Sequence, residues 1–419
     1  MRGFQSWFLI VLALLTSSAA HAEPGDDLSI SLLTMGPGEH PFTKFGHTAI
    51  WVHDAQQNRD EVYNYGTFSF DAPTALLDSV AGKLPYWLSE QSFRGTLHAY
   101  QDQGRSLVAS ELELTPAQRA ELYAALLDNV RPQNRYYRYD YFRDNCTTRA
   151  RDIFDRVLGG SLRAASRQPA SLSYRDHMLR LVAEAPELYV GLDVAVGRQA
   201  DVPLTVWEEA FLPEKLHELL AATRVSQGGR ELPLIRSERV LLSGHVPAAR
   251  SLPPSWASRY AGLGLALGGA LGLLGLAAQR SRVARVLLGF AYFVFGFGLG
   301  LLGCALCYLT FFSAHSAAAS NYNVLLVPPW ALLLGVAGVG VARGKGRGAR
   351  LALWAALGAL ASSMLALLLH VLTGHAQANG QELAAVLPLW LGASVAAWQL
   401  VVPDRVIARL PPQVAVGER

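Results

Sequence analysis

The chain has 419 residues, which is enough for two or three domains. Hydrophobic residues make up 51% of it and charged residues only 16%, whereas a soluble domain carries about 25% charge, so part of the chain is expected to lie in lipid. The net charge of +3 and the lack of a basic stripe with interleaved aromatic residues argue against nucleic acid as a partner.

The first 22 residues have the features of a secretory signal peptide. Arg2 supplies a positive start, residues 7–15 form a short apolar stretch, and residues 18–22 end in an A-x-A-like site. We expect cleavage after Ala22, and the alternative is an uncleaved anchor, for which the apolar stretch is short. In either case the residues that follow are expected to be exported.

Residues 23–235 have a globular composition, and one histidine near their start lies in a strand-like sequence. Residues 45–52 read FGHTAIWV, and the glycine before His47 permits the close approach of another group. The next strand-like segment holds Tyr63, Asn64 and Tyr65, and one of these side chains could hold the second imidazole nitrogen and fix its tautomer. Taken alone, His47 is more simply a histidine satisfied within a strand, and it gains a role only together with a nucleophile.

Cys146 is the only cysteine of the predicted exported domain, because Cys304 and Cys307 fall in an apolar stretch. An unpaired thiol in an oxidising compartment is a liability unless it is buried or used. Asp144 and Asn145 are strong N-cap types, and apolar residues follow Cys146 at helical spacing, so a helix is predicted to begin at Cys146. A helix N-terminus stabilises a thiolate, which favours a nucleophile over a buried packing residue.

A thiolate enzyme also needs a base, usually histidine, so Cys146 and His47 form the candidate catalytic pair. Asn64 is the candidate third member, and the sequence does not decide between it and the two neighbouring tyrosines. No cluster of further ligands accompanies Cys304 and Cys307, and we predict no metal and no cofactor. The tyrosine-rich run at 136–142 is either core or a surface that touches lipid. Two arginines flank the thiol and either bind a phosphate or pair with Asp140 and Asp152: Arg143 and Arg149.

Residues 236–260 are rich in Pro, Ser and Arg and are predicted to be a linker into the membrane. Five apolar stretches follow, each long enough to cross a hydrocarbon core of about 30 Å. They span residues 261–278, 286–312, 323–342, 350–372 and 383–402, and leave a tail at 403–419.

The charges between these stretches predict the orientation of the chain. Connections 313–322 and 373–382 hold no Lys or Arg, whereas the other two connections and the tail are basic. By the positive-inside rule, this alternation places residues 23–260 in the periplasm and the C-terminus in the cytoplasm of a bacterial inner-membrane protein. The basic residues are Arg280, Arg282, Arg285, Arg343, Lys345, Arg347, Arg350, Arg405 and Arg409.

The order of the two catalytic candidates resembles a known arrangement. Papain-like NlpC-type peptidases usually carry the cysteine helix first, whereas here His47 on a strand precedes Cys146 at a helix start. This is the order of the permuted branch, which includes lecithin–retinol acyltransferase-type enzymes and in which an Asn-Cys pair opens the nucleophile helix. The resemblance implies an α+β permuted papain-like (NlpC-type) periplasmic domain, followed by an all-α membrane domain of five transmembrane helices.

More specifically, the chain resembles the Lnb family of bacterial lipoprotein N-acyltransferases. The matching stretches are residues 45–49, 63–68, 82–88, 134–140 and 144–149 with Arg151 and Asp152, and, in the membrane half, His315 followed by Asn321, Asn323 and Leu325. The resemblance covers most of the chain and is weakest over residues 160–235 and in the last two spans.

The resemblance implies that Cys146 attacks an acyl ester of a membrane phospholipid, with His47 as the general base. The acyl chain would then pass from the thioester to the α-amine of the lipid-modified N-terminal cysteine of a lipoprotein. An oxyanion hole is required, and backbone N–H groups at the start of the Cys146 helix are the expected donors. The candidates for binding the substrates are Tyr63, Tyr65, Asp144, Asn145, Arg149, His315, Asn321 and Asn323.

Three alternatives stay open from the sequence. His315, Asn321 and Asn323 either contact a substrate or cap helices and join spans. The same Cys-His pair would also serve a membrane-anchored hydrolase, either a phospholipase or a cell-wall peptide amidase. Finally, the chain could be a membrane protein without enzymatic activity in which Cys146 is simply buried.

Overall fold

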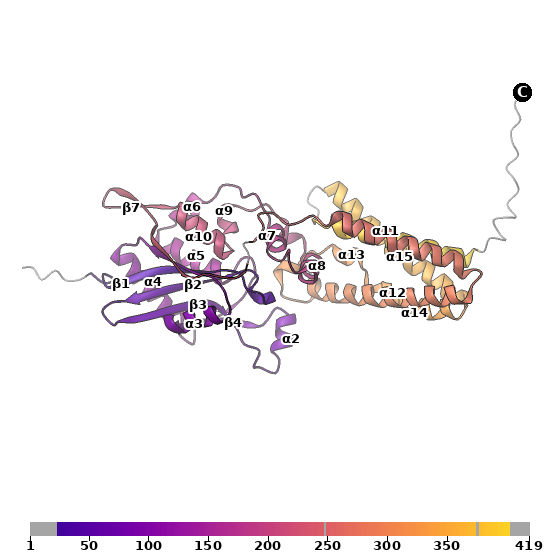
Figure 1. Ribbon diagram of the computed structural model, residues 1–419, viewed down its shortest axis with the longest axis horizontal. Helices are drawn as coiled ribbons and strands as arrows, with labels where there is room; N and C mark the ends of the chain where they lie inside the picture. The colour runs from indigo at the N-terminus through magenta and orange to yellow at the C-terminus, as the bar shows by residue number, and fades with distance from the viewer. Residues whose placement is uncertain (1–22, 247–248, 374–376, 403–419) are drawn as a thin grey trace, which may run out of the picture.

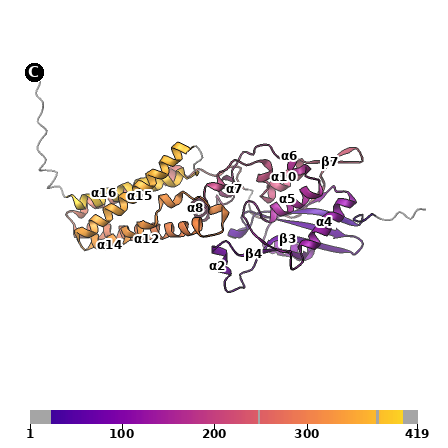
Figure 2. The same cartoon turned by 180° about the vertical axis from the view of Figure 1, so that it is seen from behind.

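The computed structural model describes residues 23–246, 249–373 and 377–402, and the predicted signal peptide and the tail at 403–419 lie outside these residues. The described chain has two halves that follow one another along the longest axis (Figure 1). The first half is a sheet covered by helices, and the second is a set of long helices. Figure 2 shows the same division from behind.

The first half is built on a seven-stranded antiparallel sheet with the strand order β6-β4-β3-β2-β1-β5-β9. Side chains on the central strands point alternately to the two faces of the sheet, and those on both faces are largely buried. The strands are β1 (Leu28–Met35), β2 (His47–Asp54), β3 (Arg59–Thr67), β4 (Pro85–Ser92), β5 (Leu107–Leu112), β6 (Tyr136–Arg138) and β9 (Ile235–Leu242). A separate hairpin consists of β7 (Arg224–Gln227) and β8 (Arg230–Pro233).

Each face of the sheet is covered by different helices. One face packs against α4 (Pro116–Asn129), α5 (Cys146–Val157) and α10 (Pro213–Ala222). The other face packs against α3 (Phe93–Asp102), which lies across the sheet from α5 in Figure 1. The remaining elements of this half are η1 (Pro41–Thr43), α2 (Ala75–Val80), α6 (Ser161–Ala165), α7 (Tyr174–Leu181), α8 (Pro186–Ala195), η2 (Arg198–Ala200) and α9 (Val206–Glu209).

The structure differs from the sequence expectation at the end of this half. Residues 236–242, which were predicted to belong to the linker, form most of β9, the edge strand beside β5. Five consecutive residues of β9 are exposed and several are charged, which is common on edge strands because charge discourages pairing with other chains. The alternation of apolar residues that reveals a strand is therefore missing from this one.

The second half contains five apolar helical segments, each long enough to cross a membrane. They are α11 (Ala257–Ala278), α12 (Arg282–Phe311), the third segment Asn323–Ala342, α15 (Gly346–Thr373) and α16 (Gly380–Val401). The third segment is interrupted by Pro328 and Pro329, which divide it into α13 (Asn323–Leu326), η4 (Pro329–Ala331) and α14 (Leu332–Ala342). Small residues let the helices approach closely: a Cβ on Gly392 would lie 2.1 Å from the carbonyl oxygen of Gly268.

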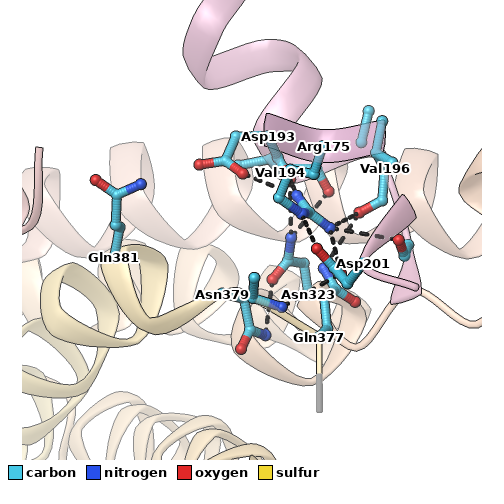
Figure 3. A network of polar contacts seen from close by, with 12 residues as sticks. Arg175, Asp193, Val194, Val196, Asp201, Asn323, Gln377, Asn379 and Gln381 are labelled. Carbon is cyan, nitrogen blue, oxygen red and sulfur yellow. Dashed lines mark hydrogen bonds and ion pairs between the residues drawn. The ribbon is translucent and has the colours of Figure 1, made fainter. Parts of the chain in front are cut away.

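A buried polar network joins the two halves (Figure 3). On the sheet-containing side, the guanidinium of Arg175 in α7 donates to both carboxylate oxygens of Asp201, at 2.6 and 3.1 Å. It also donates to the side chain of Asp193 at 2.8 Å and to the carbonyl oxygen of Val196 at 2.9 Å. These contacts fix the chain that follows α8 and hold its carbonyl groups toward the membrane helices.

Amide side chains of the membrane half donate hydrogen bonds to those carbonyl groups. Asn321 donates to the carbonyl oxygen of Val194 at 2.8 Å, and Asn323 donates to the same oxygen at 3.0 Å. Gln377 donates to Val196 at 3.2 Å, and Asn379 donates to the Oδ1 atom of Asn323 at 3.0 Å. Because both sides are buried and hydrogen bonded, the network fixes the first half on one end of the helical half.

Candidate active site

The thiol lies at the start of α5, and the cap of this helix explains why. Asn145 is the N-cap residue, and its Oδ1 atom accepts hydrogen bonds from the backbone N–H groups of Thr147 and Thr148, at 2.8 and 2.9 Å. The hydroxyl of Thr148 in turn accepts from the backbone N–H of Asn145 at 2.8 Å. Both ends of the Asn145 side chain are occupied, since its Nδ2 atom donates to the carbonyl oxygen of Phe211 at 3.0 Å.

Cys146 and His47, which are 99 residues apart in the sequence, meet because β2 packs beside the start of α5. The hydroxyls of Thr48 and Thr147 lie 3.0 Å apart and link the two elements next to the site. The imidazole of His47 forms a hydrogen bond with the sulfur of Cys146. The two candidate catalytic residues are therefore in direct contact.

The surroundings of the sulfur favour its ionised form. Burial acts to raise the pKa of the Cys146 thiol, but it is outweighed by the charge and hydrogen bond of His47, the backbone N–H of Thr48 and the hydroxyl of Thr147. Together these groups lower the pKa to about 7. A sulfur that is buried among apolar groups alone would have a raised pKa and be inert.

Asn64 lies on the other side of the imidazole. Its Oδ1 atom is 3.3 Å from Nε2 of His47, and its Nδ2 atom donates to the carbonyl oxygen of Val62 at 3.4 Å. Since the amide nitrogen is engaged in this way, Oδ1 is the atom that faces the ring and accepts from Nε2–H. The resulting tautomer leaves Nδ1 unprotonated and free to take a proton from the thiol.

Gly66 lies beside Cys146 and has a φ of +87°. A Cβ at this position would lie 3.5 Å from Cβ of Cys146, 3.9 Å from the hydroxyl of Tyr137 and 3.2 Å from the ring of Tyr139. A side chain on residue 66 would thus fill the space between the nucleophile and the two tyrosines. A glycine here combines left-handed backbone with room for a reacting group.

The two tyrosines bring hydroxyl groups to this space. The hydroxyl of Tyr139 forms a hydrogen bond with the Cys146 sulfur, and burial and the neighbouring thiolate charge raise the pKa of this phenol. Burial and the same charge raise the pKa of Tyr137. Within the described part of the chain, the Tyr137 hydroxyl is buried and has no hydrogen-bond partner. Both phenols stay protonated at neutral pH and can donate a hydrogen bond.

Two protein-family models match the chain. The model described as the Lnb N-terminal periplasmic domain matches residues 18–183, and that described as the Lnb transmembrane domain matches residues 266–389. The chain belongs to the Lnb family. Its first half is accordingly a periplasmic domain and its five apolar helices span the inner membrane. No curated protein and no solved structure matches the chain.

Asp144 and Arg149, two further predicted site residues near the thiol of this Lnb chain, contact each other. Asp144 accepts two hydrogen bonds from Arg149, at 2.6 and 2.9 Å, so this arginine pairs with Asp144 and not with Asp140 or Asp152. The guanidinium of Arg149 also lies 3.6 Å from the ring centre of Tyr137 and steadies that ring. Asp144 and Arg149 thus hold the ring of Tyr137 in place beside the thiol.

Tyr63 and Tyr65 are buried in the core of the Lnb periplasmic domain. The Tyr63 hydroxyl donates to Glu61 at 2.9 Å, and the Tyr65 hydroxyl accepts from Asn129 at 3.0 Å. Side chains alternate along β3, so these two tyrosines point to the opposite face of the sheet from Asn64. The structure brings only Asn64 of the three to the imidazole.

The predicted site residues of the Lnb membrane domain separate into two groups. His315 reaches the periplasmic domain, where its Nε2 atom donates to the carbonyl oxygen of Ser79 at 2.9 Å and its ring stacks on Tyr141 at 5.8 Å. His315 lines a small hollow together with Tyr86 and Tyr139. Asn321 and Asn323, by contrast, are buried in the polar junction described above and the structure does not bring them to the thiol.

Sequence reasoning missed Gly66, Tyr137 and Tyr139 as parts of this Lnb site. Each lay within a stretch that resembles the family, but only the tertiary contacts single out these positions. Within the described residues, no group of three or more His, Cys, Asp or Glu side chains is placed to hold a metal ion. Among the described residues, the groups that surround the thiol include the imidazole of His47 and the phenols of Tyr137 and Tyr139.

Proposed function

We propose that this chain is a lipoprotein N-acyltransferase that moves an acyl chain from a membrane phospholipid, through a thioester on Cys146, to the α-amine of a lipoprotein's lipid-modified N-terminal cysteine. The observation that carries the proposal is the contact of the Cys146 sulfur with His47, whose far nitrogen is held by Asn64. Membership of the Lnb family supports the same reaction class. No cofactor is needed for this chemistry.

In the first half of the reaction, His47 takes the thiol proton and the sulfur attacks the carbonyl carbon of a phospholipid ester. The tetrahedral intermediate collapses as the bond from that carbon to the glycerol oxygen breaks. His47 returns the proton to the departing alkoxide, so a lysophospholipid leaves and the acyl chain remains on Cys146 as a thioester. A thiol pKa of about 7 suits this exchange at neutral pH.

In the second half, the lipoprotein's α-amine attacks the thioester carbonyl. His47 takes a proton from the attacking nitrogen, and the carbon–sulfur bond breaks to release the thiolate. An amide forms on the lipoprotein and the thiol is regenerated by the proton that His47 holds. Asn64 supports the base throughout because an imidazolium retains its Nε2–H hydrogen bond to Oδ1.

The proposed oxyanion donors keep one backbone N–H group of the start of α5 and add a tyrosine hydroxyl. The backbone N–H groups of Thr147 and Thr148 already donate to Asn145, so they are not available to the substrate. The hydroxyl of Tyr137, which is buried beside Gly66 and unpartnered among the described residues, is the donor that we assign together with the backbone N–H of Cys146. Two such donors would stabilise the developing negative charge.

The architecture of the proposed enzyme includes two further features. A His-bearing strand that precedes the Cys-bearing helix supports the permuted papain-like arrangement, and the basic connections on one side of the membrane support a cytoplasmic C-terminus. A periplasmic thiol on a domain that is joined to membrane helices favours substrates held in the outer leaflet. This observation favours a transferase or phospholipase over a cell-wall peptide amidase.

The test separates the acyltransferase from a hydrolase with the same two residues. Purified full-length protein in nanodiscs is given a phospholipid labelled in its acyl chain, with and without a diacylated lipopeptide that has a free α-amine. We expect label on the lipopeptide nitrogen and a requirement for Cys146. Label found only as free fatty acid, with or without the acceptor, would instead assign a phospholipase. A Cys146→Ser variant that retains full transfer would contradict both enzymes.

A further inference from the structure

The short helix α2 and the loops beside it carry exposed apolar side chains. Leu76 and Leu77 are 70% and 72% exposed, and Val80, Phe42 and Phe70 are also exposed. We call these five residues the α2 patch. Phe42 and Phe70 share contacts with Phe68, at 5.8 and 5.5 Å between ring centres, so the aromatic members form one cluster. Gathered apolar side chains of this size indicate a surface that meets another apolar phase.

The position of α2 identifies that phase. The helix stands out from the sheet on the side of the membrane helices, in both views (Figures 1 and 2). The backbone N–H of Ala314 donates to the carbonyl oxygen of Ala81 at 2.8 Å, and His315 donates to Ser79 at 2.9 Å. These bonds attach the C-terminal end of α2 to the residues that directly follow α12.

The apolar length of α12 places its end at the edge of the hydrocarbon core. Phe311 and Phe312 are the last apolar residues of this span, and Phe312 is 74% exposed, as expected for aromatic side chains at the level of the lipid headgroups. Since Ala314 and His315 connect this end of α12 directly to α2, the α2 patch lies near the level of that end. A lipid surface is therefore the occupant that the attachment favours over a second protein.

A row of aromatic rings leads from the α2 patch to the nucleophile. Phe68 lies 5.2 Å from Tyr86, and Tyr86 stacks on Tyr139 with ring centres 4.3 Å apart. Tyr139 in turn forms a hydrogen bond with the sulfur of Cys146. The small hollow lined by Tyr86, Tyr139 and His315 adjoins this row.

We infer that the α2 patch inserts into the outer leaflet of the membrane, and that the row from Phe68 to Tyr139 guides one acyl chain of a bilayer lipid to Cys146. The insertion stands on the exposed side chains and their attachment to α12. The guidance of an acyl chain rests on the proposed function. Burial of Leu76 and Leu77 in lipid removes their apolar surface from water and holds the mouth of the site at the membrane.

The insertion is tested without any catalytic activity. Full-length protein carrying Cys146→Ser is reconstituted in nanodiscs of phosphatidylethanolamine and phosphatidylglycerol, with photoreactive benzoylphenylalanine in place of Leu77. Leu301, on the exposed face of α12, is the positive control position, and Leu127, exposed on α4, is the negative one. We expect lipid adducts at positions 77 and 301 and none at 127.

Three results would overturn the insertion. Lipid adducts at position 301 without adducts at 77 would place the α2 patch outside the bilayer. Equal lipid labelling at 77 and 127, both below that at 301, would show that position 77 meets lipid no more than an exposed helix of the soluble domain does. A crosslinked dimer in place of a lipid adduct at position 77 would assign the patch to a second copy of the chain.

The guidance of the acyl chain is tested by comparing two donors. A double variant, Leu76→Gln with Leu77→Gln, is expected to slow acylation of Cys146 by a bilayer phospholipid at least tenfold and to leave acylation by soluble p-nitrophenyl butyrate unchanged. Leu127→Gln is the matched control. Equal loss with both donors, or no loss with the phospholipid, would contradict the guidance. If the unsubstituted protein accepts neither donor, the proposed function fails, and the crosslinking alone decides the insertion.

Discussion

The Oδ1 atom of Asn64 lies 3.3 Å from Nε2 of His47, the imidazole that also forms a hydrogen bond with the sulfur of Cys146. The three side chains come from β3, β2 and the start of α5, so the sheet and one helix together determine their geometry. In the proposed mechanism the amide fixes the tautomer, the imidazole accepts a proton, and the sulfur, whose pKa is lowered to about 7, is the nucleophile.

The ionisation of the thiol is expected to appear in its alkylation. Because the pKa of Cys146 is lowered to about 7, its reaction with iodoacetamide should rise with pH around that value, instead of around the 8.5 or so of a free cysteine. In His47→Ala the midpoint should move upward, beyond that of a free cysteine, because burial is the largest influence and raises the pKa. Mass spectrometry of the Cys146 peptide between pH 5 and 10 gives the midpoints. A midpoint that does not respond to His47→Ala would contradict the pairing.

Asn64 is expected to act as a positioning residue. In Asn64→Ala the imidazole loses its fixed tautomer, and acylation of Cys146 should slow by about tenfold to a hundredfold, a part of the 10²–10⁴ that a general base contributes. Asn134→Ala, on an exposed loop, is the matched control. Asn64→Ala should also shift the pH midpoint of Cys146 alkylation, whereas the loss of an amide with only a structural role would not. Unchanged rates and an unchanged midpoint would remove Asn64 from the site.

Gly66 is expected to be essential for the space beside the sulfur. Gly66→Ala adds a methyl group 3.5 Å from Cβ of Cys146 and 3.2 Å from the ring of Tyr139, so acylation should fall sharply. Gly159→Ala is the control, because Gly159 has a φ of +66° and nothing within 4 Å of an added Cβ. Both variants pay a similar backbone cost of about 1–2 kcal/mol in the free energy of unfolding. Equal activity of the two would show that the space is not used.

Tyr137 is expected to stabilise the oxyanion. Tyr137→Phe removes only a hydroxyl that has no partner among the described residues, so the folded state should lose little stability, whereas the acylation rate should fall by about 10²–10³. Tyr136→Phe, at an exposed position on the same strand, is the control. Rapid mixing with a chromogenic ester, together with a thermal melt, measures both quantities. Full acylation in Tyr137→Phe would exclude this donor.

The polar junction is expected to contribute stability and not substrate affinity. Arg175→Met leaves Asp193 and Asp201 buried without their cation, which should cost about 3–5 kcal/mol. Asn323→Ala leaves the carbonyl of Val194 with one donor fewer and should cost about 1–3 kcal/mol. Thermal melts in detergent measure the loss of stability, and the KM for the phospholipid measures any loss of substrate affinity. An Asn323→Ala variant with normal stability but a raised KM would favour the substrate contact that the sequence analysis left open.

The two candidate catalytic residues, which the structure brings together, could be singled out because their signals are local. A glycine before a histidine on an alternating strand, and an Asn cap before a cysteine on a helix, are both visible in a short window of sequence. The five apolar helices were predicted for the same reason, since length and composition define a span. Period-two alternation along β3 likewise separates Asn64 from Tyr63 and Tyr65.

The rest of the site depends on contacts between distant segments. Tyr137 and Tyr139 reach the sulfur only because β6, a strand of three residues, pairs with β4 at the sheet edge. The junction likewise joins residues up to 181 positions apart, so a sequence window shows polar loops but not their partners. Strand β9 escaped prediction because its exposed charged residues conceal the strand period.

The acyl transfer itself is tested most directly on lipoproteins made in cells. A bacterial host that lacks its own N-acyltransferase is given this chain, its Cys146→Ser variant or its His47→Ala variant, and the N-terminal lipopeptide of one abundant lipoprotein is weighed by mass spectrometry. The account predicts a triacylated peptide with an N-linked acyl chain for the unsubstituted chain, and a diacylated peptide for both variants. A diacylated peptide in all three strains, or a triacylated one with Cys146→Ser, would contradict it.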